Sequence, residues 1–140
     1  MQRILKHYNF PLHETTFKQI SFSSYPGTLA SNDDFYIADN GLNVIETSIN
    51  MVNMSIYDLV RPQSNFCWMR VMAAYRLSKT GKEWTHNFAL YNSGTYNNEW
   101  MVVDYKLFKP RTHLADGVLW VAEQVPGYVH AEDMTSMLRM

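Results

Sequence analysis

The chain has 140 residues, of which 46% are hydrophobic and 14% aromatic, so it has enough apolar residues for a core and its composition excludes an intrinsically disordered chain. Its 12 basic and 13 acidic residues give a formal net charge of -1, and no basic stripe indicates a nucleic-acid partner. No stretch of about eighteen apolar residues predicts a transmembrane helix, and residues 1–7 lack the apolar core of a signal peptide.

The first third of the chain is predicted to be mainly extended. Residues 1–8 are the exception, since Ile4 and Leu5 suit the end of a helix that Pro11 terminates. Three strands are expected from short runs rich in apolar residues, at residues 17–24, 35–38 and 42–49.

A tight hairpin is predicted between the second and third of these strands. Asp39-Asn40-Gly41 places there the residue types that accept the positive φ angles of hairpin turns. Both faces of the strand at residues 42–49 are half apolar, so we expect this strand to lie between two layers.

The middle of the chain is predicted to be helical. Residues 55–60 suit one or two helical turns, and Ser64 is expected to cap a helix over residues 65–79. Thr80 and Glu83 have the spacing of a capping box and predict the start of a second helix. The first long helix is expected to bury an apolar stripe at helical spacing, made of Phe66, Met69, Ala73 and Leu77.

The C-terminal third is predicted to contain two strands, at residues 99–107 and 118–125, and Pro126-Gly127 is expected to end the second. Residues 131–140 are expected to begin a further helix. The predicted order is therefore a helix, three strands, two helices and two strands. Strands that are grouped apart from helices indicate an α+β fold instead of a parallel α/β sheet.

Three acidic residues, Glu46, Asp104 and Glu123, fall inside otherwise apolar strands. A buried carboxylate needs a partner. We expect ion pairs or backbone hydrogen bonds, with Arg70 and Arg76 as candidate partners. A metal site or a pair of catalytic acids is the less favoured alternative.

The sequence offers no recognisable metal cluster or ordinary lipase triad. Cys67 is the only cysteine, and we expect it to be a small core thiol because no motif activates it. Asp33 and Asp34 are expected to form a turn, with calcium binding as a remote alternative. The five histidines, His7, His13, His86, His113 and His130, have no metal-ligand spacing. We therefore predict no metal and no cofactor.

The most specific feature of the chain is the sequence of residues 91–106, YNSGTYNNEWMVVDYK, in which a polar loop changes abruptly into a strand. Asn and Gly accept backbone angles that other residues avoid, and Asn side chains hold such loops rigid by bonding to the backbone. Asn92 in this loop is a candidate substrate-binding residue. Shaping the entry to the strand is the favoured alternative for the loop.

This motif resembles the signature of the phospholipase B-like family, also called the laminin A or lamina ancestor family. Shorter motifs follow in the order of that family: Ser23-Ser24-Tyr25-Pro26-Gly27-Thr28, Asp33-Asp34-Phe35-Tyr36-Ile37, Gly41-Leu42, Glu46-Thr47 and Glu123-Gln124-Val125-Pro126-Gly127. The resemblance runs over essentially the whole chain. It implies that the chain is a middle slice of what the family needs.

The resemblance also implies a fold. The family is similar to N-terminal nucleophile hydrolases, whose fold is a four-layer αββα sandwich. Residues 1–140 would then be a single partial domain, a partial αββα sandwich that supplies part of both sheets and one helix pair.

In such hydrolases a Cys, Ser or Thr at a new N-terminus attacks the substrate, and its own α-amino group is the base. In the family a Cys has this role, and no position of this chain matches it. The resemblance places the Cys, with the His and Trp that follow it, before residue 1, and the family's site Asn and Arg after residue 140. One site residue carries over, Ser48 of Glu46-Thr47-Ser48, which replaces a Thr. Thr47 beside it is a further candidate for substrate binding.

The resemblance therefore implies a fragment or truncated product of a phospholipase B-like hydrolase, which cleaves acyl esters or amides in lipid degradation. Its substrate would be a phospholipid or another acylated small molecule, and the chain is expected to be inactive alone. The alternative is a non-catalytic decayed paralogue or an interaction module, which binds other segments of a family chain. The family implies a secreted or lysosomal location, where the sequon Asn53-Met54-Ser55 would be glycosylated.

Overall fold

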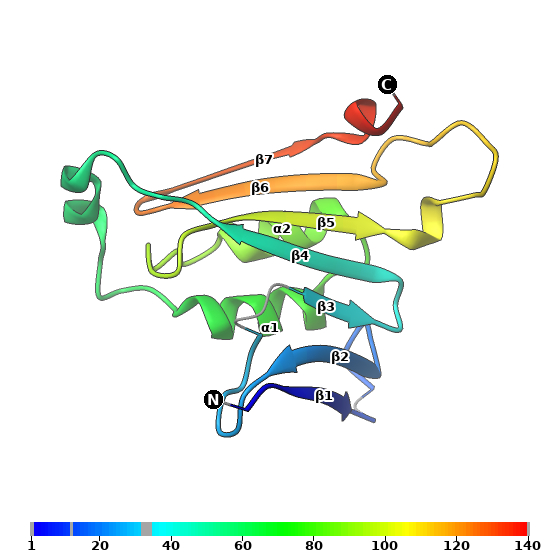
Figure 1. Cartoon of the computed structure of the whole chain (residues 1–140), viewed down its shortest axis with the longest axis horizontal. Helices are drawn as coiled ribbons and strands as arrows, with labels where there is room; N and C mark the ends of the chain where they lie inside the picture. Colours follow the sequence, from blue (N-terminus) through cyan, green and yellow to red (C-terminus); the bar gives the residue numbers. More distant parts are fainter. Residues whose placement is uncertain (1, 12, 32–34, 140) are drawn as a thin grey trace.

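The computed structural model describes residues 2–11, 13–31 and 35–139, and these residues form one antiparallel sheet with helices on one face (Figure 1). The sheet has seven strands in sequence order, each hydrogen-bonded to the next. They are β1 Ile4–Asn9, β2 Gln19–Ser24, β3 Phe35–Ala38, β4 Leu42–Ser48, β5 Asn98–Asp104, β6 Leu119–Val125 and β7 Tyr128–Asp133. The helices are α1 Cys67–Leu77 and α2 Gly81–Ala89, with short 3-10 helices at Met54–Leu59, Tyr105–Leu107 and Thr135–Arg139.

This mixed architecture agrees with the α+β class, but the prediction that the chain supplies parts of two sheets is wrong for the described residues. All seven strands belong to one sheet, because every connection between neighbouring strands returns to the adjacent position. The predicted turn at Asp33 and Asp34 lies outside the described residues.

The N-terminal segment is a strand, so the helix end predicted at residues 1–8 is wrong. β1 pairs with β2 from Ile4 opposite Ser24 to Asn9 opposite Gln19. Tyr8 packs edge-on against the ring of Phe22, with 5.2 Å between the ring centres. Side-chain exposure alternates along β1, as in a strand with one covered face. Pairing with β2 therefore outweighs the helical preference of a few local residues.

The predicted hairpin between β3 and β4 is confirmed. Gly41 has a φ of 83°, and its N–H donates to the carbonyl of Ala38 at 3.1 Å. A Cβ at this position would also lie 2.8 Å from Cγ of Lys106. The backbone angle therefore favours glycine here, and a Cβ would in addition require the Lys106 side chain to move.

The helices begin partly where the sequence predicts. Thr80 caps α2, and its hydroxyl accepts a hydrogen bond from the Glu83 N–H at 3.2 Å, which confirms the predicted cap. The cap predicted for α1 is wrong, because the Ser64 hydroxyl donates to the carbonyl of Arg61 instead. The N–H of Asn65 bonds to the carbonyl of Tyr91, which keeps the chain extended at this point.

The predicted apolar stripe of α1 is not the buried one. Phe66, Met69, Ala73 and Leu77 are all exposed on the outside of the helix. The residues that face the sheet include Val71 and Tyr75, which are two positions beyond Met69 and Ala73. α1 is apolar on both sides, so helical spacing alone does not identify the side that packs against the sheet.

The C-terminal strands differ from the prediction in two places. β5 ends at Asp104, because this carboxylate accepts a hydrogen bond from the Lys106 N–H and begins a short 3-10 helix. Pro126-Gly127 ends β6 at Val125 as predicted and forms the turn into β7. The helix predicted from residue 131 is wrong over residues 131–133, where β7 continues and pairs with β6, and only the short 3-10 helix Thr135–Arg139 follows.

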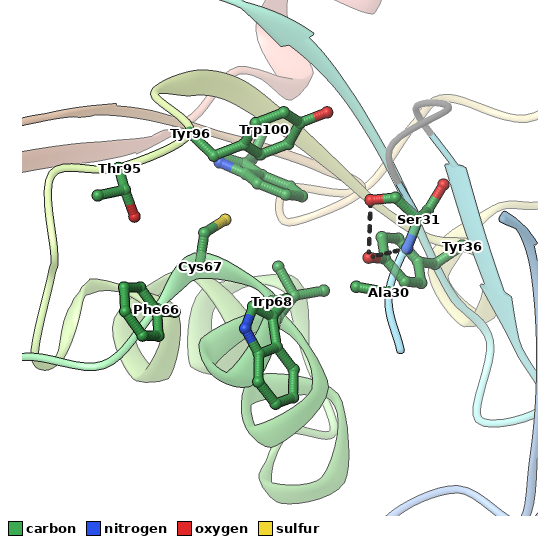
Figure 2. Close-up of a pocket in the computed structure, with 10 residues that line it drawn as sticks. Ala30, Ser31, Tyr36, Phe66, Cys67, Trp68, Thr95, Tyr96 and Trp100 are labelled. Atoms are coloured by element: carbon green, nitrogen blue, oxygen red, sulfur yellow. Dashed lines mark hydrogen bonds between the residues drawn. The ribbon is translucent and has the colours of Figure 1, made fainter. Parts of the chain in front are cut away.

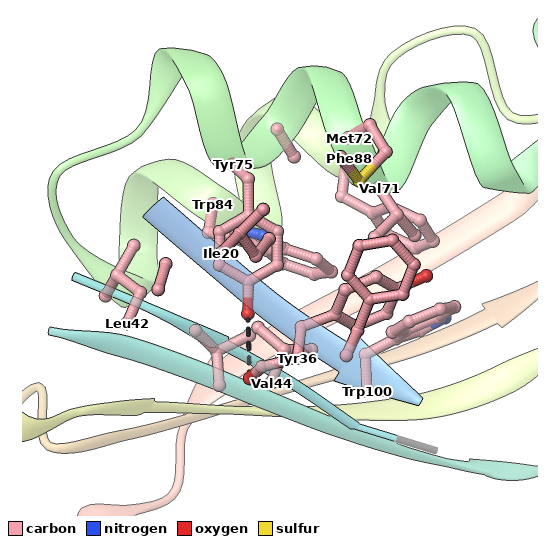
Figure 3. Packing of buried hydrophobic residues seen from close by; sticks show 14 of the residues in the cluster. Ile20, Tyr36, Leu42, Val44, Val71, Met72, Tyr75, Trp84, Phe88 and Trp100 are labelled. Atoms are coloured by element: carbon pink, nitrogen blue, oxygen red, sulfur yellow. Dashed lines mark hydrogen bonds between the residues drawn. The ribbon is translucent and has the colours of Figure 1, made fainter. Parts of the chain in front are cut away.

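The core is an aromatic layer between the sheet and the two helices (Figure 3). Trp84 and Phe88 of α2 stack with their ring centres 5.0 Å apart, and Phe88 lies 4.9 Å from Trp100 of β5. The Tyr75 hydroxyl of α1 donates to the carbonyl of Tyr36 in β3 at 3.3 Å. These contacts connect both helices to the centre of the sheet.

The opposite face of the sheet carries apolar side chains that no described residue covers well. Ile37 of β3 is 53% exposed and Ile45 of β4 is 46% exposed. The strand β4 is therefore buried on one face only, whereas the sequence predicts a layer on each side. No described helix is long and apolar enough to cross a membrane. The term open face is used below for the surface that contains Ile37 and Ile45.

Candidate functional site

The predicted site residues Thr47 and Ser48 lie at the end of β4. Both are exposed, and in the sheet they pair with Glu99 and Asn98 of β5. Because successive side chains of a strand point to opposite faces, Thr47 belongs to the open face and Ser48 to the face that the helices cover. The structure therefore separates the two hydroxyls that the sequence places side by side.

A buried carboxylate lies next to Ser48 on the same face. Glu46 is two residues earlier in β4, and its Oε1 accepts a hydrogen bond from the Tyr96 hydroxyl at 2.6 Å. The prediction that the acids pair with Arg70 or Arg76 is wrong for Asp104, which forms its ion pair with Lys106 at 2.7 Å. Tyr96 has a φ of 53°, an uncommon angle for a bulky residue. One partner of Glu46 is thus a residue of the polar loop at 91–98.

The loop at residues 91–98 is fixed by one buried arginine. Arg70 of α1 is only 3% exposed. Its Nη1 donates to Oδ1 of Asn92 and to Oε1 of Gln124, both at 3.1 Å. Its Nε donates to the carbonyl of Phe88 at 2.9 Å, near the C-terminal end of α2 where carbonyls lack helical partners. Burial lowers the pKa of Arg70 to about 10, so the side chain stays charged at neutral pH.

The amide of Asn92 is fully engaged in the structure of this loop. Its Oδ1 accepts from Arg70 and from the Gly94 N–H at 3.0 Å. Its Nδ2 donates to the carbonyls of Val125 and Tyr128, at 2.8 and 3.3 Å. An amide has two donors and two acceptor sites, and all four are used. This geometry favours the shaping role of Asn92, and substrate binding by it stays a prediction.

Sequence reasoning missed Gln124, whose side chain donates hydrogen bonds to the loop from β6. It is completely buried in β6. Its Nε2 donates to the carbonyl of Thr95 at 3.0 Å and to Oδ1 of Asn97 at 3.1 Å. Gln124 belongs to the family-like motif at residues 123–127, so the sequence does indicate that this residue matters. The motif alone does not show which face of the strand Gln124 occupies.

Asn98 is a second residue that the sequence analysis missed. It lies opposite Ser48 and is 1% exposed. Neither Oδ1 nor Nδ2 has a hydrogen-bond partner among the described residues. A buried polar group without a partner costs about 1–3 kcal/mol. This unsatisfied amide lies at the start of β5, opposite Ser48 at the end of β4.

A cavity of about 340 Å³ lies on the same face of the sheet, between the start of α1 and the polar loop (Figure 2). Cys67, Trp68 and Trp100 are among the residues that line it. Burial raises the pKa of the Cys67 thiol to about 12, so the thiol is protonated at neutral pH. This agrees with a core thiol, since the thiolate is the nucleophilic form.

The remaining predicted position, Asn53, is exposed and precedes the 3-10 helix Met54–Leu59. Its Oδ1 accepts hydrogen bonds from the N–H and the hydroxyl of Ser55. The sequon is therefore at the surface. Among the described residues, no group of three or more His, Cys, Asp or Glu side chains is arranged to hold a metal ion.

Comparison with known proteins agrees with the motif-based resemblance. The family model Phospholipase B matches residues 1–140. The chain is 49% identical over 144 residues to Phospholipase B-like protein D of Dictyostelium discoideum and 46% identical over 145 residues to Putative phospholipase B-like 3 of Caenorhabditis elegans. It is 44% identical over 141 residues to Phospholipase B-like 1 of Rattus norvegicus. These alignments cover 99% of this chain but only 25–26% of each relative, so the chain spans about a quarter of their length.

Proposed function

This chain belongs to the phospholipase B family, and on that premise we propose that it is one segment of a hydrolase that cleaves acyl esters or amides. The substrate class is phospholipid or another acylated small molecule. The observation that supports this proposal most is the family match over the whole chain, together with identities of 44–49% to relatives about four times as long.

In this proposal the chain provides structure and one site residue, and the nucleophile comes from another segment of the hydrolase. The Ser48 hydroxyl lies at an exposed strand end, where it can donate a hydrogen bond to the nucleophile or to the oxyanion. The only cysteine, Cys67, is buried and has a raised pKa. The chain by itself is therefore expected to be inactive.

Exposed apolar surfaces support the idea that further layers pack against this chain. The open face presents Ile37 and Ile45, and the outer side of α1 presents Phe66 and Leu77. Apolar patches of this kind commonly mark surfaces that bind protein. A second sheet on the open face, covered by its own helices on the far side, would complete the four-layer αββα sandwich of N-terminal nucleophile hydrolases, which we propose as the fold of the whole enzyme.

The proposal is tested by placing this chain in a longer family member that hydrolyses phospholipid, in exchange for the matching segment. We expect the chimera to hydrolyse the substrate, Ser48→Thr to retain the rate and Ser48→Ala to lower it at least tenfold. Ser48 is exposed, so neither change is expected to alter the melting temperature. A folded Ser48→Ala chimera with an unchanged rate would show that Ser48 has no part in the reaction.

A non-catalytic module is the second candidate function, and one observation favours it. The described residues have a core of their own, in which both helices pack on the central strands. A domain that folds alone is expected to melt cooperatively and to keep its near-ultraviolet dichroism. If it does so and also binds a longer family chain without hydrolysis, the module is the better account.

We also propose that the hydrolase is secreted or lysosomal and carries a glycan on Asn53. The support is the exposed sequon at the start of a surface turn. Expression through the secretory pathway is expected to give a product whose mass falls after glycan removal, and Asn53→Gln is expected to abolish this change. Ser55→Ala removes the same sequon and is the matched control.

A further inference from the structure

We propose that the cavity beside Trp68 and Trp100 binds the hydrocarbon chain of an uncharged acyl lipid. The cavity has a volume of about 340 Å³. Figure 2 shows Phe66 and Thr95 at one end and Ala30 and Tyr36 at the other, with Cys67 and Trp68 between them. The space is therefore formed by α1, β3, β5 and the loop before β5.

The inner wall of the cavity is held by the core of the protein, whereas Phe66 and Trp68 on its outer side are exposed. Tyr36, Val71 and Trp100 are each almost completely buried. Trp100 contacts Phe88 and Trp84, and Tyr36 contacts Tyr75, so these rings are fixed from behind. Protein interiors are usually packed without large voids. A hollow of this size with a rigid inner wall falls in the range of about 300–1,000 Å³ that is typical of small-molecule sites.

The chemistry of the walls selects an apolar and uncharged occupant. Most of the lining is aromatic or aliphatic carbon, and none of the described residues that line it is charged. The Tyr36 hydroxyl bonds to the N–H of Ser31 at 2.7 Å, and the Tyr96 hydroxyl donates to Glu46. The single donor of the Tyr96 hydroxyl is thus already used by Glu46, so it is not free to bind a carboxylate in the cavity. A hydrocarbon chain with an ester or alcohol end suits these walls.

The position of the cavity suits an acyl chain whose carbonyl points toward Ser48. Trp100 lies opposite Glu46 in the sheet, and Asn98 lies opposite Ser48 one pair further along the same face. Two residues of a strand span about 7 Å. The choice of an acyl chain as the occupant rests on the proposed function, whereas the cavity and its apolar walls do not.

The chain contains its own reporters for a binding experiment. Trp68 and Trp100 are two of its four tryptophans, and Cys67 is its only cysteine. The probe is monolauroylglycerol below its micelle concentration, with a bromine-labelled form of the same lipid as a fluorescence quencher. We expect saturable quenching by the labelled lipid, relief of quenching by the unlabelled lipid, and slower reaction of Cys67 with a thiol reagent.

Variants separate binding in the cavity from binding elsewhere. Trp68→Phe is expected to reduce the quenched signal, whereas Trp120→Phe, outside the cavity, is expected to retain it. Ala30→Phe fills the cavity and is expected to weaken binding at least tenfold, and Ala73→Phe on the outside of α1 is the control. Alkylation of Cys67 adds a group to the cavity wall without changing Ala30 or Trp68, and it is expected to abolish binding.

The results that contradict the proposal are unsaturable quenching, equal quenching in Trp68→Phe and Trp120→Phe, or unchanged Cys67 reactivity in the presence of lipid. Near-ultraviolet dichroism confirms that each variant is folded. The experiment requires no hydrolysis, so its outcome is independent of the chimera assay. If the chain binds the lipid but the chimera is inactive, the cavity proposal is supported and the hydrolase proposal is rejected. If the chimera is active but the chain does not bind the lipid, the hydrolase proposal is supported and the cavity proposal is rejected.

Discussion

Replacing Arg70 is predicted to destabilise the chain more than any exposed substitution, because this side chain connects α1, α2, β6 and the polar loop. Arg70→Ala leaves the Gln124 Oε1 and the Phe88 carbonyl without their charged donor. Hydrogen bonds to charged groups contribute about 1.5–3 kcal/mol each. The guanidinium also lies 4.2 Å from the centre of the Phe88 ring. We therefore expect Arg70→Ala to lower the free energy of unfolding by about 3–5 kcal/mol.

The assay is urea unfolding followed by tryptophan fluorescence. Arg70→Lys retains the charge but not the planar set of donors, so we expect an intermediate loss of about 2 kcal/mol. Arg76→Ala is the matched control on the same helix, and it is expected to cost less than about 1 kcal/mol because Arg76 is only partly buried. A loss below about 1 kcal/mol in Arg70→Ala would refute the role of Arg70 as the residue that holds the loop.

Three further predictions concern single residues. Gly94→Ala is expected to lower the free energy of unfolding in urea by about 2–3 kcal/mol, because φ is 69° and the new Cβ would lie 2.8 Å from Cα of Pro126. Gly27→Ala is the control, since φ is also positive, at 83°, but the new Cβ would have no neighbour within 4 Å. It is expected to cost about 1 kcal/mol. Asn98→Leu removes a buried amide that has no partner among the described residues, so the free energy of unfolding of the isolated chain is expected to rise by about 1 kcal/mol. A lower free energy of unfolding would show that the amide is hydrogen-bonded in the folded chain. The folded-state pKa of Cys67 is raised from 9.0 to about 12, so the folded state holds this proton more tightly and stability falls as pH rises above the unfolded value. From about pH 8 to about pH 10 the loss is about 1.4 kcal/mol, and Cys67→Ala is expected to lack it when the two unfolding curves are compared.

Local signals predicted the elements whose chemistry is contained in a few adjacent residues. The turn at Gly41 needs a positive φ, and the cap at Thr80 needs a hydroxyl three residues before Glu83, so both are visible in the sequence. β1 and β7 were missed because they depend on pairing with β2 and β6. Such pairing is decided by residues distant in the sequence, and short apolar runs do not reveal it.

The candidate site was predictable in part. The family-like motif at residues 91–106 indicates the family that the comparisons show, whereas the role of Ser48 rests on the resemblance alone and stays a prediction. The side-chain network was not predictable, since Arg70 was expected to pair with an acid and in fact donates to two amides and a carbonyl. Asn98 and Gln124 were missed because only the strand register shows which face they occupy.

The most direct test of the central claim is the initial rate of phospholipid hydrolysis by the chimera that contains this chain, measured beside its Ser48→Thr and Ser48→Ala variants. We expect activity in the chimera and in Ser48→Thr, and at least a tenfold lower rate in Ser48→Ala with an unchanged melting temperature. A folded chimera with no hydrolysis, while the parent enzyme remains active, would contradict the assignment of this chain as a functional segment of a phospholipase B-like hydrolase.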